Sequence, residues 1–294
     1  MRITAVIPVC NESETIRPLY AELREVAEAN DYRLRCIFVD DGSTDGSWQV
    51  VSELAATDDR VLGIRFRRNF GKAAALSAGF DAADDPLVVT LDADLQDDPH
   101  ELPMMLARLR EGYDVVSGWK QVRNDPLSKV LPSRLFNWLV SWLTGVRLHD
   151  HNCGFKVYKR EVLDELRLYG ELHRFVPVLA AARGFRIAEV PVNHRAREHG
   201  QSKYGASRIV KGFLDLVTVK FLTGYGQRPL HPFGALGLGA SLIGSLGMIW
   251  LAMRWVISRV VDGMEPIHLH ETASLFYCLA LLFIGAQLLT VGLL

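Results

Sequence analysis

Residues 87–99 read Leu-Val-Val-Thr-Leu-Asp92-Ala-Asp94-Leu-Gln96-Asp-Asp-Pro, an apolar run that passes directly into an acidic turn. The run predicts a buried strand, and the two acids spaced by one residue follow its carboxyl end. Carboxylate oxygens at this spacing can hold a hard divalent cation and leave positions for diphosphate oxygens. Acidic turns also occur as solvated loops, so the stretch alone leaves both interpretations open.

The chain before this stretch alternates short apolar runs with helical patterns. This alternation predicts βαβ units, hence an α/β protein with a mostly parallel sheet flanked by helices. Ligand sites in such sheets form beyond the carboxyl ends of the strands. The expected strands are residues 3–9, 35–39, 61–66 and 87–91, and the expected helices are residues 13–29, 47–56 and 72–82.

Two further strands of the predicted sheet end in polar residues. Asp40 and Asp41 end one apolar run, and Asn11 and Glu12 follow another, just after Pro8. A glycine turn with a helix cap explains residues 42–45 but does not explain two adjacent acids at a strand end. Together with residues 92–96, these strand ends predict one polar site at one edge of the sheet.

Composition excludes two broad classes of protein. With 33 Lys and Arg against 34 Asp and Glu, the net charge is −1, which removes the electrostatic argument for a nucleic-acid binder. Residues 229–253 and 272–294 carry no Asp, Glu, Lys or Arg over 25 and 23 residues. Each stretch can span a hydrocarbon core of about 30 Å. A purely soluble protein is therefore excluded, and the strand-like start predicts no signal peptide.

The predicted organisation has two parts. Residues 1–228 form a catalytic domain, and residues 229–294 form a membrane anchor with spans at about 231–255 and 272–294. Lys and Arg cluster between residues 195 and 220, which places the domain in the cytoplasm. A helix at about 126–145 has a Leu, Phe and Trp face with Arg134 and Asn137 on the opposite side, and it either packs on the sheet or lies in the membrane interface. The four scattered cysteines predict reduced thiols that serve as packing residues.

The motifs P-x-x-N-E, D-D-G-S-T-D, R-N-F-G-K and D-A-D-L-Q-D-D-P together resemble the family 2 glycosyltransferases, and within them the polyprenyl-phosphate hexosyltransferases. The resemblance covers essentially the whole chain. It implies a GT-A (Rossmann-like) fold, a nucleotide-sugar donor, a divalent metal (Mg²⁺ or Mn²⁺) and inversion at the anomeric carbon. Leu251 stands where processive synthases carry the Gln of Q-x-x-R-W, so chain elongation is not expected.

The resemblance also implies roles for individual residues. Asp40 resembles the acid that binds the nucleoside, and Arg67, Asn69 and Gly71 belong to a segment between nucleotide and sugar. For Lys72 the alternative is a solvated residue at a helix start. The implied nucleotide-sugar site comprises Pro8, Asn11, Glu12, Asp40, Asp41, Lys72, Asp92 and Ala93, and the implied metal ligands are Asp92, Asp94 and Gln96.

Two later motifs resemble the acceptor side of the family. His149-Asp150-His151-Asn-Cys-Gly-Phe resembles the D-x-x-C-G-F segment, which implies that Asp150 is an acid near the acceptor. The two histidines could ligate a metal, but a pair at this spacing in a turn is more often incidental. Residues 195–205 match R-x-x-x-x-G-x-S-K-Y, whose basic side chains could instead contact anionic lipids. The implied catalytic residues are Asp94, Asp150 and Lys203, and the implied acceptor-phosphate ligands are Arg123, Arg134, Arg195, Ser202 and Lys203.

The sequence therefore predicts a membrane enzyme that transfers one hexose from a UDP- or GDP-sugar to a polyprenyl phosphate. Its expected partners are the nucleotide sugar, the lipid and the membrane, with no nucleic acid; a homo-oligomer is left open. Two alternatives stay open at this point. One is transfer to another membrane lipid such as diacylglycerol, and the other is a catalytically silent membrane scaffold.

Overall fold

The computed structural model describes residues 1–121, 127–195, 207–225, 230–261 and 267–293. The described chain divides into two compact units, Met1–Lys220 and Phe221–Leu294. The predicted division after residue 228 falls in a stretch outside the described residues and stays a prediction.

The first unit is built on a seven-stranded sheet with the order β3-β2-β1-β4-β6-β5-β7. β6 pairs antiparallel with both β4 and β5, and the other four pairings are parallel. The predicted mostly parallel sheet is therefore confirmed. The strands are β1 Arg2–Val9, β2 Arg33–Asp40, β3 Val61–Arg65, β4 Leu87–Thr90, β5 Val115–Lys120, β6 Lys156–Lys159 and β7 Ile187–Val192.

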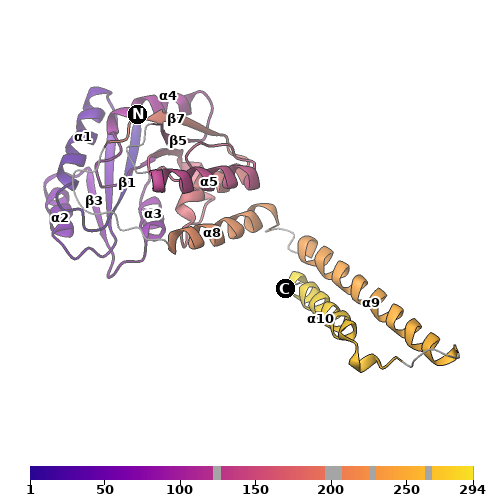
Figure 1. Ribbon diagram of the computed structural model, residues 1–294. Coiled ribbons are helices and arrows are strands. Elements are labelled where there is room, and N and C mark those ends of the chain that lie inside the picture. Colours follow the sequence, from indigo (N-terminus) through magenta and orange to yellow (C-terminus); the bar gives the residue numbers. More distant parts are fainter. Residues whose placement is uncertain (122–126, 196–206, 226–229, 262–266, 294) are drawn as a thin grey trace. The chain divides into compact units, whose positions relative to one another are not determined.

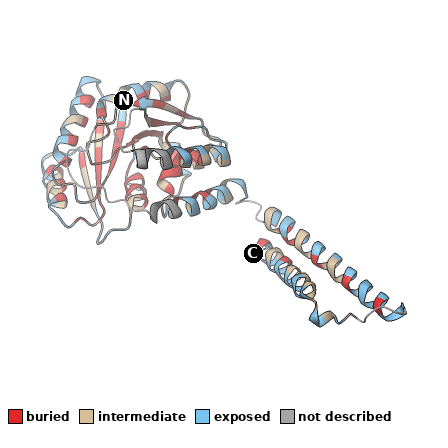
Figure 2. Cartoon of the chain, viewed as in Figure 1, coloured by how far each residue is buried: buried red, intermediate tan, exposed pale blue. Residues whose placement is uncertain are grey.

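Helices cover both faces of this sheet, which explains why its central strands read as continuous apolar runs (Figures 1 and 2). In β1, Ala5 and Ile7 pack toward one core and Val6 toward the other, as the two-residue period of a strand requires. The first core includes residues of α1 Ile16–Ala29, α2 Ser47–Thr57 and α4 Leu102–Arg110; the second includes residues of α3 Lys72–Asp81, α5 Leu127–Thr144, α6 Arg160–Asp164, α7 Val176–Ala182 and α8 Ser207–Gly224.

Two long apolar helices form most of the second unit. α9 Leu230–Val260 and α10 Ala273–Leu293 are long and apolar enough to cross a membrane, with mean hydropathies of 1.7 and 2.0. Glycines bring their backbones together: a Cβ on Gly237 would lie 2.8 Å from the Gly285 carbonyl oxygen. Small residues allow such close approach where no hydrophobic effect drives helix association. The two spans predicted from charge-free stretches therefore correspond to one packed pair of helices.

Candidate active site

A pocket of about 260 Å³ lies beyond the carboxyl ends of β1, β2 and β4. Parallel strands deliver their ends to one edge of the sheet, so segments far apart in the chain meet there. The pocket brings together six residues of the predicted nucleotide-sugar site and one further predicted metal ligand. Its lining residues are Pro8, Val9, Cys10, Glu12, Asp41, Asn69, Gly71, Lys72, Asp92, Ala93, Asp94, Glu171, His173 and Arg174.

Lys72 and Asp92 form a charged pair in the lining of this pocket. Lys72 is the first residue of α3, and its ammonium group donates to Asp92 Oδ1. Burial opposes ionisation of Asp92, but the cations of Lys72 and Lys120 together hold the pKa of this carboxyl below its usual range. Asp92 is therefore an anion at neutral pH, ready to ligate a cation.

Asp41 ties the loop before α3 to the end of β2. Its two carboxylate oxygens accept hydrogen bonds from the backbone amides of Phe70 and Gly71, at 2.7 and 2.9 Å. Burial raises the pKa of Asp41, against the opposing effect of these two bonds. The two loops come so close that a Cβ on Gly42 would lie 2.4 Å from the backbone of Arg68, and Gly42 itself has a φ of +69°. Only glycine fits this turn without strain.

Asp40 and Asn11 shape the neighbouring turn rather than line the pocket. Asp40 is fully buried; its Oδ1 accepts a hydrogen bond from Ser43 N at 3.0 Å, and its Oδ2 lies 3.6 Å from Arg65 Nε. Asn11 Oδ1 accepts from Thr44 N at 2.8 Å. These bonds position the loop that follows β2. The predicted contacts of both residues with the nucleoside stay predictions.

The three predicted metal ligands lie in the acidic turn after β4, but they do not all face the pocket. Asp92 and Asp94 both line the pocket and offer the hard oxygen donors that Mg²⁺ and Mn²⁺ prefer. The Gln96 amide nitrogen instead lies 3.4 Å from both His194 Nε2 and the Arg195 carbonyl oxygen. Two of the three predicted ligands therefore fit a metal in the pocket, while Gln96 is directed toward the end of β7.

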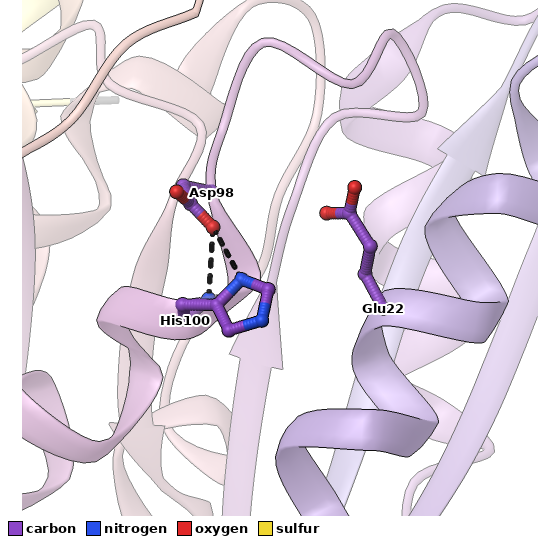
Figure 3. Close-up of side chains that lie close together, drawn as sticks. All are labelled: Glu22, Asp98 and His100. Atoms are coloured by element: carbon purple, nitrogen blue, oxygen red, sulfur yellow. Dashed lines mark hydrogen bonds and ion pairs between the residues drawn. The ribbon is translucent and has the colours of Figure 1, made fainter.

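Arg195 holds a second group of charged residues together outside the pocket. Glu22, Asp98 and His100 lie close enough in space to suggest a metal site (Figure 3). However, the Arg195 guanidinium contacts both carboxylates, at 2.8 and 2.9 Å to Glu22 and 2.7 Å to Asp98. Its backbone amide also donates to the Gln96 carbonyl at 2.9 Å. Arg195 thus supplies the cation in this cluster and joins α1, the acidic turn and β7.

We expect Arg195→Ala to lower the melting temperature of the detergent-purified protein by about 3–12 °C. Charge-assisted hydrogen bonds contribute roughly 1.5–3 kcal/mol, and in a chain of this size 1 kcal/mol corresponds to about 2–4 °C. Arg183→Ala is the matched control, because Arg183 is more exposed and lies 3.6 Å from one exposed carboxylate of Glu165. An unchanged melting temperature for Arg195→Ala would contradict a structural role for this residue.

The loop that carries Asp150 is fixed by a strand of the same sheet. Glu189 of β7 accepts hydrogen bonds from the backbone amides of His149 and Asp150, both at 2.9 Å. Asp150 is buried and does not line the pocket. The two histidines face different partners: His149 stacks on Trp119, whereas His151 Nε2 lies 3.0 Å from Ser141 Oγ. Burial lowers the pKa of His151 to about 4.

The outward surface of α5 is apolar. Asn137 was expected on the polar face of this helix together with Arg134. It is instead buried, and its amide nitrogen donates a hydrogen bond to the His149 carbonyl at 2.8 Å. Leu135, Trp138 and Trp142 are 64%, 61% and 68% exposed on the other side. The helix therefore packs on the domain through one face and presents Trp to its surroundings through another, with Arg134 exposed beside Leu135.

Besides Val9 and Cys10 at the end of β1, three pocket residues were not predicted from the sequence. These are Glu171, His173 and Arg174. They belong to or adjoin the short helix η2 Leu172–Phe175, far along the chain from the acidic turn. The sequence shows only a histidine and an arginine just before an apolar helix. No sequence motif relates these two residues to the strand ends, so their place in the pocket could not be predicted. Three predicted residues, Arg123, Ser202 and Lys203, lie outside the described residues.

Comparisons with known proteins agree with this architecture. Residues 4–167 match the family model described as Glycosyl transferase family 2. The chain is 36% identical to a dodecaprenyl-phosphate galacturonate synthase of Rhizobium johnstonii, over all of this chain and 86% of that protein. It is 32% identical to an undecaprenyl-phosphate 4-deoxy-4-formamido-L-arabinose transferase of Aeromonas hydrophila subsp. hydrophila, over 99% of this chain and 86% of the relative.

Solved structures confirm the predicted GT-A fold. Glucosyl-3-phosphoglycerate synthase from Mycobacterium tuberculosis, solved with Mn²⁺, uridine diphosphate and phosphoglyceric acid, superposes with a TM-score of 0.59 at 19% identity, over 76% of this chain and 78% of that chain. Mannosyl-3-phosphoglycerate synthase from Rubrobacter xylanophilus gives 0.58 at 18% identity, over 75% and 74%. At these identities the likeness concerns the fold alone.

Proposed function

The chain belongs to glycosyltransferase family 2, and from that membership we propose that it transfers a single hexose from a nucleotide sugar to a polyprenyl phosphate in a membrane. The observation that carries this proposal is the pocket where Asp92, Asp94 and Lys72 meet beyond the parallel strands. Relatives that align over nearly the whole chain, apolar helices included, are named as transferases or synthases of prenyl-phosphate sugars.

The donor occupies the strand-end pocket. Loops held by Asp41 and Asn11 surround the nucleotide, and the diphosphate lies toward Asp92, Asp94 and Lys72. A divalent cation bound by Asp92 and Asp94 would neutralise the leaving diphosphate. The donor set of two pocket carboxylates supports either Mg²⁺ or Mn²⁺. Lys72 contributes a positive charge beside the same phosphate oxygens, at the start of α3.

The acceptor phosphate is itself the nucleophile. A phosphate monoester has a second pKa of about 6, so it is largely a dianion at pH 7 and needs no strong general base. One of its oxygens forms a bond to the anomeric carbon while the bond from that carbon to the diphosphate breaks, and the nucleoside diphosphate leaves. The chain's contribution is to hold the two reactants in line and to stabilise the departing charge.

The proposed topology places both termini on the cytoplasmic side, with α9 and α10 as spans. The support is the excess of Lys and Arg before the first span, compared with Arg254 and Arg259 near the connecting loop.

We expect a cysteine at position 268, in the loop between the two helices, to react with an impermeant maleimide added outside intact cells. The His268→Cys variant would be made with Cys10 and Cys278 replaced by Ala. Asp59→Cys, exposed in the first unit, is the matched control and reacts only after the cells are opened. The reverse labelling pattern would invert the topology.

The function itself is tested with membranes containing the overexpressed protein, radiolabelled UDP- and GDP-hexoses, and undecaprenyl or dolichyl phosphate. The expected product is a labelled lipid that releases its sugar in mild acid. Labelled diacylglycerol instead would favour transfer to a different lipid. Absence of any labelled lipid across the panel of donors would favour the scaffold alternative.

A further inference from the structure

The wall of the pocket formed by η2 carries two hydrogen-bonding side chains that the proposed donor site does not use. His173 and Arg174 line the same pocket as Lys72 and Asp92. His173 Nδ1 is buried and has no hydrogen-bond partner within the described part of the chain. Arg174 is 6% exposed, and its guanidinium pairs with Glu171 at 2.5 Å. A buried ring nitrogen without a partner requires an explanation, and at a residue of a pocket wall a bound ligand or an ordered water can supply the missing hydrogen bond.

His173 is neutral in this setting. Burial, together with the nearby cations Lys72, Arg174 and Lys156, lowers the pKa of His173 well below its usual range despite the opposing charge of Asp92. A neutral imidazole donates one N–H and adds no charge. Arg174, by contrast, keeps its charge and offers several N–H groups in a planar fork suited to phosphate.

The other side of η2 packs beneath the apolar outer helices of the same unit. Phe175 packs edge-on against Phe136 of α5, with ring centroids 6.1 Å apart. Arg174 Nη1 lies 3.9 Å from the position that a Cβ on Gly212 of α8 would take. Within the described residues of the first unit, the two helices expose six large apolar side chains: Leu135, Trp138, Trp142, Phe213, Leu214 and Val217. η2 therefore connects the polar pocket to a surface suited to a lipid chain.

We propose that His173 and Arg174 form the subsite for the phosphate of the lipid acceptor, with its apolar chain toward α5 and α8. This inference rests on the proposed function. The donor diphosphate lies toward Asp92, Asp94 and Lys72, so a second anion in the pocket requires its own donors. A cation and a neutral N–H donor provide them, and Glu171 holds the Arg174 fork in place.

The test measures both substrates separately in His173→Ala, His173→Asn and Arg174→Lys. We expect both variants to raise the acceptor KM about 10-fold or more, since His173→Ala removes an N–H donor to the phosphate and Arg174→Lys replaces the planar guanidinium fork by a single ammonium group. The donor KM should change less than about twofold. His173→Asn, which retains an N–H donor, should recover part of the loss. Arg183→Lys, on the same part of the chain but outside the pocket, is the matched control.

Direct binding of a short-chain polyprenyl phosphate, followed by tryptophan fluorescence, separates this inference from the proposed function. We expect wild type to bind the phosphate about 10-fold more tightly than Arg174→Lys, even if it transfers no sugar to that lipid. Equal affinities would overturn the subsite, as would a raised donor KM with an unchanged acceptor KM. Arg174→Lys and His173→Asn retain polar groups at the buried positions, so loss of folding is not expected to obscure the result.

Discussion

Asp94→Asn is expected to lower sugar transfer about 100- to 1000-fold while the protein remains folded. The substitution removes one of the two carboxylates that the acidic turn contributes to the pocket, in a site where a single stabilising group commonly contributes that factor. Asp94 Oδ1 accepts a hydrogen bond from Gln96 N at 3.2 Å, which the amide oxygen of Asn can still accept. The turn should therefore keep its shape. Initial rates at saturating donor and acceptor measure the effect.

The control is Asp84→Asn, an exposed acid whose carboxylate lies 3.7 Å from Arg35 and outside the pocket. It should retain full activity. Chelator should abolish transfer by wild type, and Mg²⁺ or Mn²⁺ should restore it. Full wild-type activity in excess chelator would contradict the metal proposal, whatever the behaviour of Asp94→Asn.

The second large loss of activity is expected for Gly154→Ala, a substitution at a glycine beside the Asp92 carboxylate. A Cβ on Gly154 would lie 2.8–2.9 Å from the three carboxyl atoms of Asp92. The loop cannot easily retreat, because the Gly154 carbonyl accepts a hydrogen bond from Thr90 Oγ1 at 2.8 Å. Gly154→Ala therefore turns the Asp92 carboxylate away from Lys72. Since a displacement of about 1 Å can cost 100-fold in rate, we expect a loss of about that size.

Gly46→Ala is the matched control, because the nearest atom to its Cβ is Ser13 Cβ at 3.8 Å, an ordinary contact. Gly46→Ala should melt within about 2 °C of wild type, since position 46 is exposed and surface substitutions change stability little. The Gly154→Ala variant should also need more metal for half-maximal rate. Wild-type kinetics in Gly154→Ala would show that the position of Asp92 does not limit the reaction.

The strands and helices of the first half of the fold could largely be predicted from the pattern of apolar and polar residues along the chain. Strands β1 to β4 and the helices after them have apolar periodicities that short-range sterics and burial largely dictate. The acids at 92 and 94 are informative for the same reason, because a strand end directs its flanking residues to one edge. The later strands lack this clarity: β6 has four residues and runs antiparallel, so only its pairing with β4 and β5 identifies it.

The partners of individual charges, by contrast, depend on contacts between distant segments. Arg195 follows β7 in the chain, yet its guanidinium contacts Glu22 of α1 across 173 positions. Asn137 belongs to a helical pattern that predicts a polar face, but the loop at His149 buries it. Nothing in the order of residues near Asn137 or Arg195 encodes these partners.

The sequence thus determined the sheet class, the two apolar helices and the acidic turn with its adjoining strand ends, because each depends on the periodicity or composition of a continuous segment. Only the tertiary structure decided which residues share the pocket: it brings His173 and Arg174 to Asp92 and directs Gln96 toward β7. The physical reason is that a site is formed where the chain packs against itself, and the packing of distant segments is a property of the whole core.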